Sequence, residues 1–376
     1  MSMKKETYKL YLCKYEYTTM KVLFLIPYPI GYAPSQRFRF EQYFGLLREN
    51  NIEMDIQPFW DKRTWKVIYQ KGSFFTKLLG ITKGLIRRIL ILFRVSGYDF
   101  VFIHREIIPI GYPVIGWLIA KVFEKKIIYD FDDAIWIPNT SDTNKFFSFL
   151  KNYTSAAKLC SWAYKVSCGN EYLCDYARRF NNNVIYNPTT IDTENYHNKI
   201  RDHGSSDKFV IGWTGTHSTI QYLKVIVPVI EELEEKYDFE LLVISDMKPD
   251  FTLRSLVYKQ WNQETEIDDI LLFSAGIMPL SDDSWANGKC GFKAIQYLAL
   301  GIPALVSPVG VNTKIVDDRI NGFICKTPEQ WKENLEKLIT NRELLNDLSQ
   351  LRTGRQKVID RYSVKSNADN FLNLFQ

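Results

Sequence analysis

The sequence predicts an α/β protein in which two doubly wound, Rossmann-like domains face each other across a cleft. Short aliphatic runs such as 22–26 lack a polar–apolar alternation, as is typical of parallel strands buried on both faces. Helical stretches separate these runs, and one polar segment interrupts the pattern before it begins again. A chain of 376 residues that is 46% hydrophobic is long enough to bury two such cores.

The first half of the chain is predicted to form one domain over residues 20–190. Ser35 follows a loop that contains Gly and Pro, and we expect it to cap a helix over 35–50. Residues 1–19 are polar, carry charges of both signs and lack the apolar run of a signal peptide, so we expect a disordered extension with Met20 as an alternative start. Strands are expected at 22–26, 54–57, 100–104, 126–130, 166–167 and 184–186.

A second domain is predicted over residues 208–354, after a polar linker at 191–207. A last helix at 355–376 is expected to return to the first domain. Because ligands bind outside the carboxyl ends of parallel strands, two facing sheets predict a site in the cleft between them. Strands are expected at 209–213, 241–245, 275–280 and 304–307, and helices after the turn at 214–218 and over 291–300.

Composition narrows the class of protein. The six cysteines show no C-x-x-C spacing and no His partner at metal-ligand spacing, so we expect reduced thiols in a cytoplasmic protein. The longest uncharged run, 107–120, contains Pro113 and is shorter than the ~18–20 residues that span a bilayer.

Basic residues concentrate in one stretch. Between Asp61 and Arg94, nine lysines and arginines accompany a single acid, a net charge of +8 in a chain of +5. Bulky apolar residues alternate with these bases, which is typical of an amphipathic helix on an anionic membrane surface. Nucleic acid and a solvated helix are the alternatives. The apolar content favours a membrane partner for 62–94, and no nucleic-acid motif is present, so we expect no nucleic-acid partner.

Two stretches of the second half carry candidate chemistry. Gly215, Thr216 and His217 follow a strand, and the backbone N–H groups of such a turn can hold a phosphate, although an ordinary capped turn has the same composition. In the helix expected over 291–300, Lys293 and Gln296 lie three residues apart and share a face. A lysine in a first helical turn opposes the helix dipole, and a bound anion would offset that cost; a solvated lysine is the alternative.

Acids follow several expected strands. Asp283 and its neighbour Asp282 could ligate a metal, bind sugar hydroxyls or form a polar turn, and without a third ligand we expect no metal. In the first half, Glu106 follows one strand and Asp132 another, where carboxylates suit a carbohydrate or a cation, with helix capping as the alternative. Further polar residues near these strand ends are Arg37, Arg39 and His104.

Six stretches of the sequence carry a resemblance to a known family. They are PYPIGYAPSQRFR, HREIIPIG, YDFDDAIW, GWTGTHSTIQYL, GIMPL and GFKAIQYLALGIPALVSPVGVNTKIVDDRINGF. Together they resemble the GT-B glycosyltransferases of family 4, specifically those that build bacterial surface polysaccharides, and the resemblance spans residues 21–362. Family members carry a Glu, seven residues, and then a second Glu that opens the run matching the last motif. Here Gln296 stands at the place of the second Glu, and Gly288 or Lys289 at that of the first.

The resemblance implies a nucleotide-sugar in the second domain, an acceptor in the first, retention of anomeric configuration, and no required metal or cofactor. The Arg/Lys pair usual after the first strand of the second domain is absent, which leaves Lys293 as the diphosphate partner, and Asp132 takes approximately the place of a His found in relatives. The implied catalytic residues are Lys293, Asp132 and Glu106. The implied donor-binding residues are Gly215, Thr216, His217, Asp283, Lys289, Lys293, Gln296, Val309 and Gly310, and the acceptor-binding residues are Ser35, Arg37, Arg39 and His104.

We therefore expect an enzyme, of the hexosyltransferase class, that moves a sugar from a nucleotide diphosphate to a glycan or lipid-linked acceptor in surface polysaccharide synthesis, either lipopolysaccharide or capsule. It would be cytoplasmic and peripheral on the inner face of the cell membrane. A nucleotide-sugar epimerase on the same fold and a non-catalytic nucleotide-sugar-binding relative are the alternatives.

Overall fold

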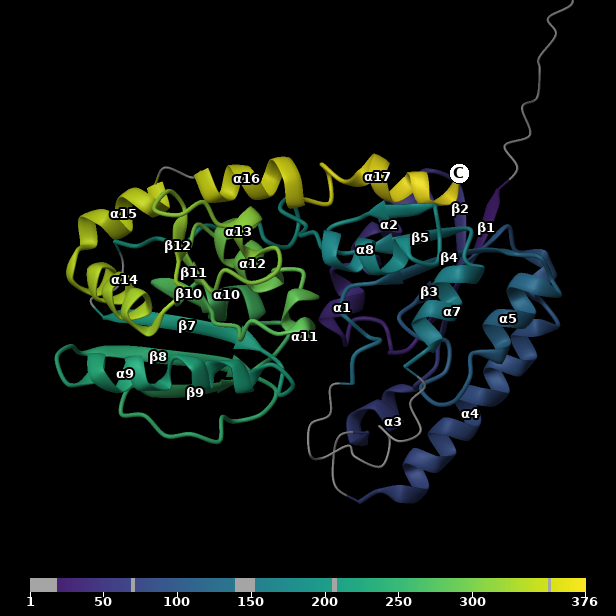
Figure 1. Ribbon diagram of the computed structural model, residues 1–376, viewed down its shortest axis with the longest axis horizontal. Coiled ribbons are helices and arrows are strands. Elements are labelled where there is room, and N and C mark those ends of the chain that lie inside the picture. Colours follow the sequence, from purple (N-terminus) through teal and green to yellow (C-terminus); the bar gives the residue numbers. More distant parts are fainter. Residues whose placement is uncertain (1–18, 69–71, 139–152, 205–207, 351–352) are drawn as a thin grey trace, which may run out of the picture.

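Two six-stranded parallel sheets make up the computed structural model, one in each half of the chain (Figure 1). The structure describes residues 19–68, 72–138, 153–204, 208–350 and 353–376. The expected extension at 1–19 therefore lies outside the described residues except for its last position, and so do positions 205–207 of the expected linker. The α/β class with two doubly wound sheets is confirmed.

The first sheet has the strand order β2-β1-β3-β4-β5-β6. Its central strands are continuous apolar runs because helices cover both faces, and β1, for example, is buried from Val22 to Ile26. The strands are β1 Met20–Ile26, β2 Ile52–Pro58, β3 Phe100–His104, β4 Lys126–Phe131, β5 Lys165–Cys168 and β6 Val184–Tyr186. The helices are α1 Pro34–Arg37, η1 Glu41–Tyr43, α2 Phe44–Glu49, α3 Lys62–Val67, α4 Phe74–Leu92, η2 Val95–Gly97, α5 Val114–Lys121, α7 Ser155–Trp162 and α8 Glu171–Arg178.

The second sheet has the order β12-β11-β10-β7-β8-β9. The strands after β9 are added on the other side of β7, so the strand order reverses between β7 and β10 while all strands stay parallel. Its strands are β7 Phe209–Gly215, β8 Phe239–Ser245, β9 Leu256–Gln260, β10 Ala275–Met278, β11 Ala304–Val306 and β12 Gly322–Ile324. Its helices are η4 Ile220–Val225, α9 Val227–Glu234, α10 Glu266–Ile270, α11 Ser284–Asn287, α12 Phe292–Ala299, α13 Asn312–Ile315, α14 Pro328–Thr340 and α15 Arg342–Gln350. The sequence did not predict β9 and β12, the two edge strands. Both are short, and β9 is only partly buried, so neither shows the continuous apolar pattern of a central strand.

The helix predicted over 35–50 is wrong in its continuity. Three short pieces replace it, because the chain leaves helical geometry at Phe38 and Phe40. Ser35 does not cap the first piece: Ala33 holds the N-cap position, and Pro34 at the first helical position supplies the fixed φ that starts the turn.

The C-terminal segment runs along both sheets (Figure 1). The single helix expected over 355–376 is two, α16 Thr353–Tyr362 and α17 Ala368–Leu372, followed by η5 Asn373–Phe375. Helix α16 packs on α12 of the second domain. Beyond it, Phe371 and Phe375 pack with Phe24 and Phe102 in the core of the first domain. The last residues of the chain thus contribute to the core formed by its first strand.

Candidate functional site

The loop after β7 and the start of α12 meet at the carboxyl edge of the second sheet. The Lys293 ammonium lies 5.3 Å from the centre of the Trp213 ring, and its aliphatic stem lies against Gly215. A Cβ at Gly215 would be 2.9 Å from Cε of Lys293 and 2.5 Å from the Trp213 indole, so only glycine leaves room for the lysine at this strand end. The structure brings together the two stretches that the sequence singled out.

Lys293 is a cation in an unfavourable environment. Burial and, to a smaller extent, the positive charge of Lys289 lower its pKa to about 7, while Asp133 acts in the opposite direction. Among the described residues no carboxylate forms an ion pair with Lys293, whereas Lys289 has Asp133 at 2.8 Å. A desolvated ammonium without a counter-ion would be stabilised by a bound anion.

Side chains of the first domain reach the same place. Asp133 follows β4 and accepts from Lys289 of the second domain and from Arg105 of its own domain. Burial alone would raise the pKa of the Asp133 carboxyl, but Lys289 and, to a smaller extent, Arg105 together hold it below its usual range. Arg105 also donates to Asp132 at 2.7 Å, and Cys290 donates to the Asp132 carbonyl oxygen at 3.1 Å. A chain of charged groups therefore crosses between the domains beside Lys293.

The turn after β7 is held by the neighbouring strand. Asp246, at the end of β8, accepts from the backbone N–H of His217 and lies 2.6 Å from His217 Nδ1. This hydrogen bond raises the pKa of the His217 imidazole. Asp246 was not predicted, because only the pairing of β7 with β8 places it beside the turn.

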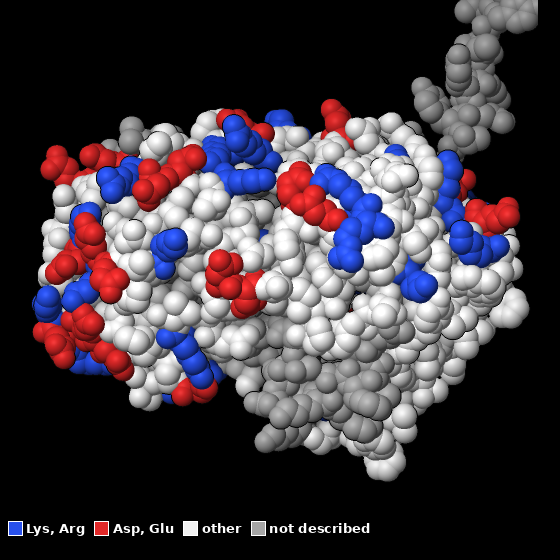
Figure 2. Space-filling model, viewed as in Figure 1, with Lys and Arg blue, Asp and Glu red and all other residues white. Residues whose placement is uncertain are grey.

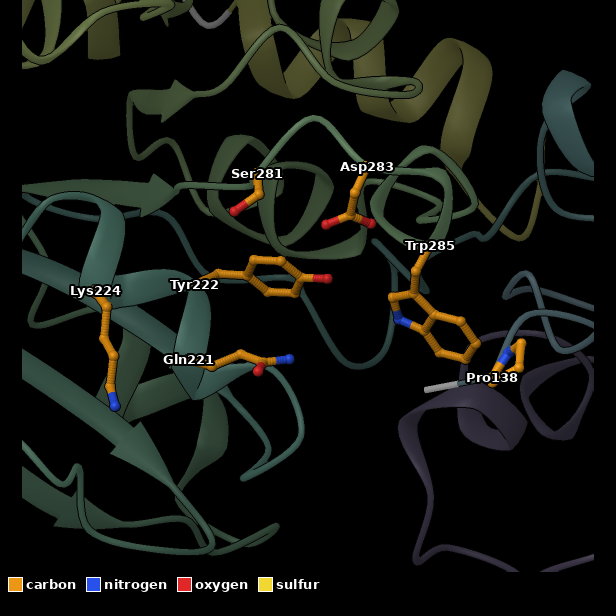
Figure 3. A pocket seen from close by; sticks show the side chains of 7 residues that line it. All are labelled: Pro138, Gln221, Tyr222, Lys224, Ser281, Asp283 and Trp285. Carbon is orange, nitrogen blue, oxygen red and sulfur yellow. The ribbon is translucent and has the colours of Figure 1, made fainter. Parts of the chain in front are cut away.

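A cavity of about 430 Å³ opens between the domains next to this turn. Figure 3 shows Tyr222 and Asp283 directed into the same space, with Trp285 beside them and Pro138 on the side of the first domain. Asp283 also caps α11, because its carboxylate accepts from the Ala286 N–H at 2.8 Å. The volume of the cavity lies within the range of ~300–1,000 Å³ that is common for small-molecule sites.

A second, smaller cavity lies in the first domain, lined among others by Tyr28, Glu106 and Ile108. Arg105 lines it too and has φ +57°, a left-handed conformation that costs energy for a side chain other than glycine. Trp285 of the second domain lines both cavities. The two cavities therefore meet at one indole, which sequence reasoning did not single out.

Several predicted acceptor residues lie inside the protein. Arg39 is buried and forms an ion pair with Asp130. The His104 ring is also buried, and its Nδ1 lies 2.8 Å from the same carboxylate. Arg37 is buried in an ion pair with Glu266 at 2.6 Å. The expectation that these three side chains contact an acceptor is corrected: they connect elements of the core and of the domain boundary. Ser35 is partly exposed but lines neither cavity.

Gln296 also lies elsewhere than expected. It does not share an exposed face with Lys293, because its side chain is fully buried. Its amide nitrogen contacts His197 Nε2 at 3.2 Å and Glu266 at 3.4 Å, while its oxygen has no hydrogen-bond partner among the residues that the structure describes. Burial lowers the pKa of His197 to about 3, so this ring is neutral. Val309 is buried, and Gly310 is exposed, with φ +59° and a bond from its N–H to Asn287.

Two further observations concern metals and membranes. Within the described ranges, no group of three or more His, Cys, Asp and Glu side chains is placed to hold a metal ion. In the same part of the chain, no helix combines the length and the hydropathy needed to cross a bilayer.

Comparison with known proteins places this geometry in context. Residues 255–353 match the family model of glycosyl transferases group 1. No curated protein sequence matches the chain. Among solved structures, a glycosyltransferase from Rickettsia africae is similar at 14% identity and TM-score 0.67, over 96% of this chain and 98% of that one. Sucrose-phosphate synthase from Thermosynechococcus elongatus is similar at 11% and 0.65, over 95% and 98%. Anabaena HepE in complex with UDP is similar at 12% and 0.60, over 94% and 99%.

Proposed function

We propose that this chain is a glycosyltransferase of group 1, since residues 255–353 match that family model and the fold is that of solved glycosyltransferases. It would move a hexosyl group from a nucleotide-diphosphate sugar to a glycan or lipid-linked acceptor, with retention of anomeric configuration and without a metal. The observation that carries the donor assignment is the Lys293 ammonium, which lies desolvated at the carboxyl edge of the second sheet and forms no ion pair with any carboxylate in the part of the chain that the structure describes. A diphosphate would supply the missing anion. HepE, a protein of the same fold, has been solved in complex with UDP, which supports a nucleotide as part of the donor.

The two cavities suggest how the substrates are arranged. The donor would take the cavity beside the 214–218 turn, with Tyr222 and Asp283 near its sugar or base. The acceptor would take the cavity that Glu106 lines, on the other side of Trp285. We propose a cytoplasmic enzyme in surface polysaccharide synthesis, of lipopolysaccharide or capsule, that lies peripherally on the inner face of the membrane through its basic region 62–94.

The group transfer follows from these positions. The acceptor hydroxyl oxygen forms a bond to the anomeric carbon, and the bond from that carbon to the diphosphate oxygen breaks. Negative charge grows on the diphosphate, where Lys293 stabilises it. The N–H groups of Thr214, Thr216 and His217 already donate to groups of the protein, so Lys293 carries this role. Glu106, which borders the acceptor cavity, is our first candidate to receive the hydroxyl proton, and Asp132, held by Arg105, is the second.

The test begins with thermal-shift screening against UDP-, GDP-, CMP- and dTDP-sugars. A ligand present at about 100 times its Kd adds ~2.7 kcal/mol to the free energy of unfolding and identifies the donor. Nucleotide release is then measured with and without lipid-extract acceptors. Release that depends on acceptor supports transfer. Interconversion of the sugar without acceptor would mean an epimerase, and a shift without any turnover would contradict the proposed transfer.

A further inference from the structure

Helix α4 has two faces of opposite character. At about 100° per residue, its buried residues Gly80, Gly84, Arg88 and Ile91 form one stripe toward the domain. The stripe packs closely, since a Cβ at Gly84 would lie 2.6 Å from the Phe59 ring and one at Gly80 2.3 Å from Thr64. The orientation of the helix is therefore determined by contacts that admit no side chain.

The opposite face is apolar and exposed to solvent. Phe75 is 84% exposed and Phe93, just after the helix, is 81% exposed. Leu79, Ile86 and Leu90 follow on the same side and are also exposed. A soluble helix normally directs polar residues outward, so this arrangement is the reverse of a domain-covering helix.

The apolar surface continues onto the neighbouring helix. Helix α5 packs against α4, and the two lie side by side at the edge of the first domain (Figure 1). Tyr112, Val114 and Trp117 at its start and Val122 at its end are exposed. In Figure 2 the surface over this part of the first domain is almost free of charged residues, whereas the second domain shows both signs. We name Phe75, Leu79, Leu90, Phe93, Val114 and Trp117 the apolar face of α4 and α5.

Positive charge borders this face. Lys83, Arg87 and Arg94 follow one another along the flank of α4 between its buried and exposed stripes, at about 80–120° from Phe75. Asp61, the only acid from 61 to 94, lies 4.0 Å from both Lys83 and Arg87. Asp55 of β2 lies 3.7 Å from Arg94, so two carboxylates face these three cations. The flank therefore keeps a positive excess.

A buried arginine connects the apolar face to the acceptor cavity. Arg88 donates to the carbonyl oxygens of Ile26, Gln57 and Ile107, at 2.8–3.0 Å. Ile107 stands between Glu106 and Ile108, which both line the cavity. Tyr112 and Val114 follow the same loop into α5. Hydrogen bonds from Arg88 thus connect the helix that carries the apolar face with the loop that lines the cavity.

We propose that the apolar face of α4 and α5 binds an anionic bilayer, so that the acceptor cavity is held at the membrane surface and receives an amphiphilic, lipid-anchored acceptor. This inference rests on the proposed function for the identity of the cavity, and it adds α5 and the orientation of the cavity to the basic region. Aromatic and aliphatic side chains would enter the interfacial layer while the flanking cations meet lipid phosphates. A second copy of the chain fits less well, because association through this face would bring like-charged flanks together.

The test uses the full chain and two kinds of vesicle, one of equal parts phosphatidylglycerol and phosphatidylcholine and one of phosphatidylcholine alone. We expect co-sedimentation with the anionic vesicles that weakens with salt. Phe75→Ser/Phe93→Ser and Val114→Ser/Trp117→Ser should each lower the partition coefficient by at least ~10-fold, because each removes two anchoring side chains. Lys83→Gln/Arg94→Gln should lower binding to anionic vesicles and leave weak binding to neutral ones unchanged. Ile320→Ser is the control, because Ile320 of the second domain is 51% exposed, about as much as Val114 at 50%, and this variant should bind as the parent does.

The outcomes separate the two proposals. Nucleotide release in the presence of a water-soluble acceptor should be the same in these variants as in the parent. If neither the parent nor any variant released nucleotide, the proposed function would be contradicted, while vesicle binding would still support the membrane proposal. Equal vesicle binding by the parent and the two apolar double variants would overturn the inference. The inference would also be overturned if light scattering showed a dimer of the parent, monomers of the apolar variants, and the parent did not bind vesicles. Thermal melting confirms that the variants are folded, since the substituted side chains are exposed.

Discussion

Removing the charge of Lys293 should separate the stability of the protein from its catalytic function. The ammonium is desolvated, faces Lys289, and has a pKa near 7. In the unfolded chain a lysine has a pKa of about 10.4, so between about pH 7 and 10 the unfolded state binds more protons than the folded state. This residue therefore makes the folded protein more stable as the pH rises through that window. Lys293→Met should raise the melting temperature at pH 6–7 without donor, because it removes an unpaired buried charge.

The same charge should be required for the donor. A bound diphosphate raises the pKa of Lys293 back toward its usual value, so donor binding takes up a proton. If only the protonated form binds well, the Kd should rise about 30-fold between pH 6 and pH 8.5, since each unit above a pKa of 7 costs about tenfold. Lys293→Met should lower turnover at least ~100-fold, the effect of losing one charge partner of the transition state. Lys293→Arg, which stays charged, should bind donor with little pH dependence.

Calorimetric titration with the nucleotide sugar identified by thermal shift provides the assay, since the charge of its diphosphate is constant over this pH range. Repeating it in buffers of different ionisation enthalpy counts the protons taken up. His217 also titrates nearby, its pKa raised by Asp246, so His217→Asn is the control that isolates Lys293. A lower melting temperature for Lys293→Met at pH 7, or a pH profile of donor affinity that this variant does not change, would refute the reasoning.

Two further predictions concern packing. Gly215→Ala should weaken donor binding by about tenfold or more, because the new Cβ displaces Lys293 and Trp213, whereas Gly45→Ala, which meets no neighbouring atom, should leave donor affinity unchanged in the same titration. Arg88→Met should lower the free energy of unfolding in urea by about 2–3 kcal/mol, because three buried carbonyl groups lose their donor, while the exposed Arg94→Met should change it by no more than about 0.5 kcal/mol. Equal effects of Arg88→Met and Arg94→Met would contradict the role assigned to the buried guanidinium.

The site could be predicted in part. The sequence singled out Lys293 and the turn at 214–218 by local rules, a lysine at a helix start and small residues after a strand, and the structure places the two side by side. Arg39 and His104 were misplaced by the same rule, since polar residues at a strand end point either into the cleft or back into the domain. Arg39 and His104 both pair with Asp130 inside the domain, so their side chains point back into the domain.

By itself the sequence determined the two doubly wound domains, because central strands buried on both faces must be apolar throughout, and it determined the basic, apolar character of the segment that forms α4. The tertiary structure alone decided which groups meet between the domains. Asp133 reaches Lys289 across 156 positions of sequence, and Trp285 borders both cavities. Such contacts depend on how two sheets are placed relative to each other, and no local propensity records that placement. The outward direction of Phe75 and Phe93 was likewise settled by the glycines on the other side of α4, which only packing against Phe59 and Thr64 reveals.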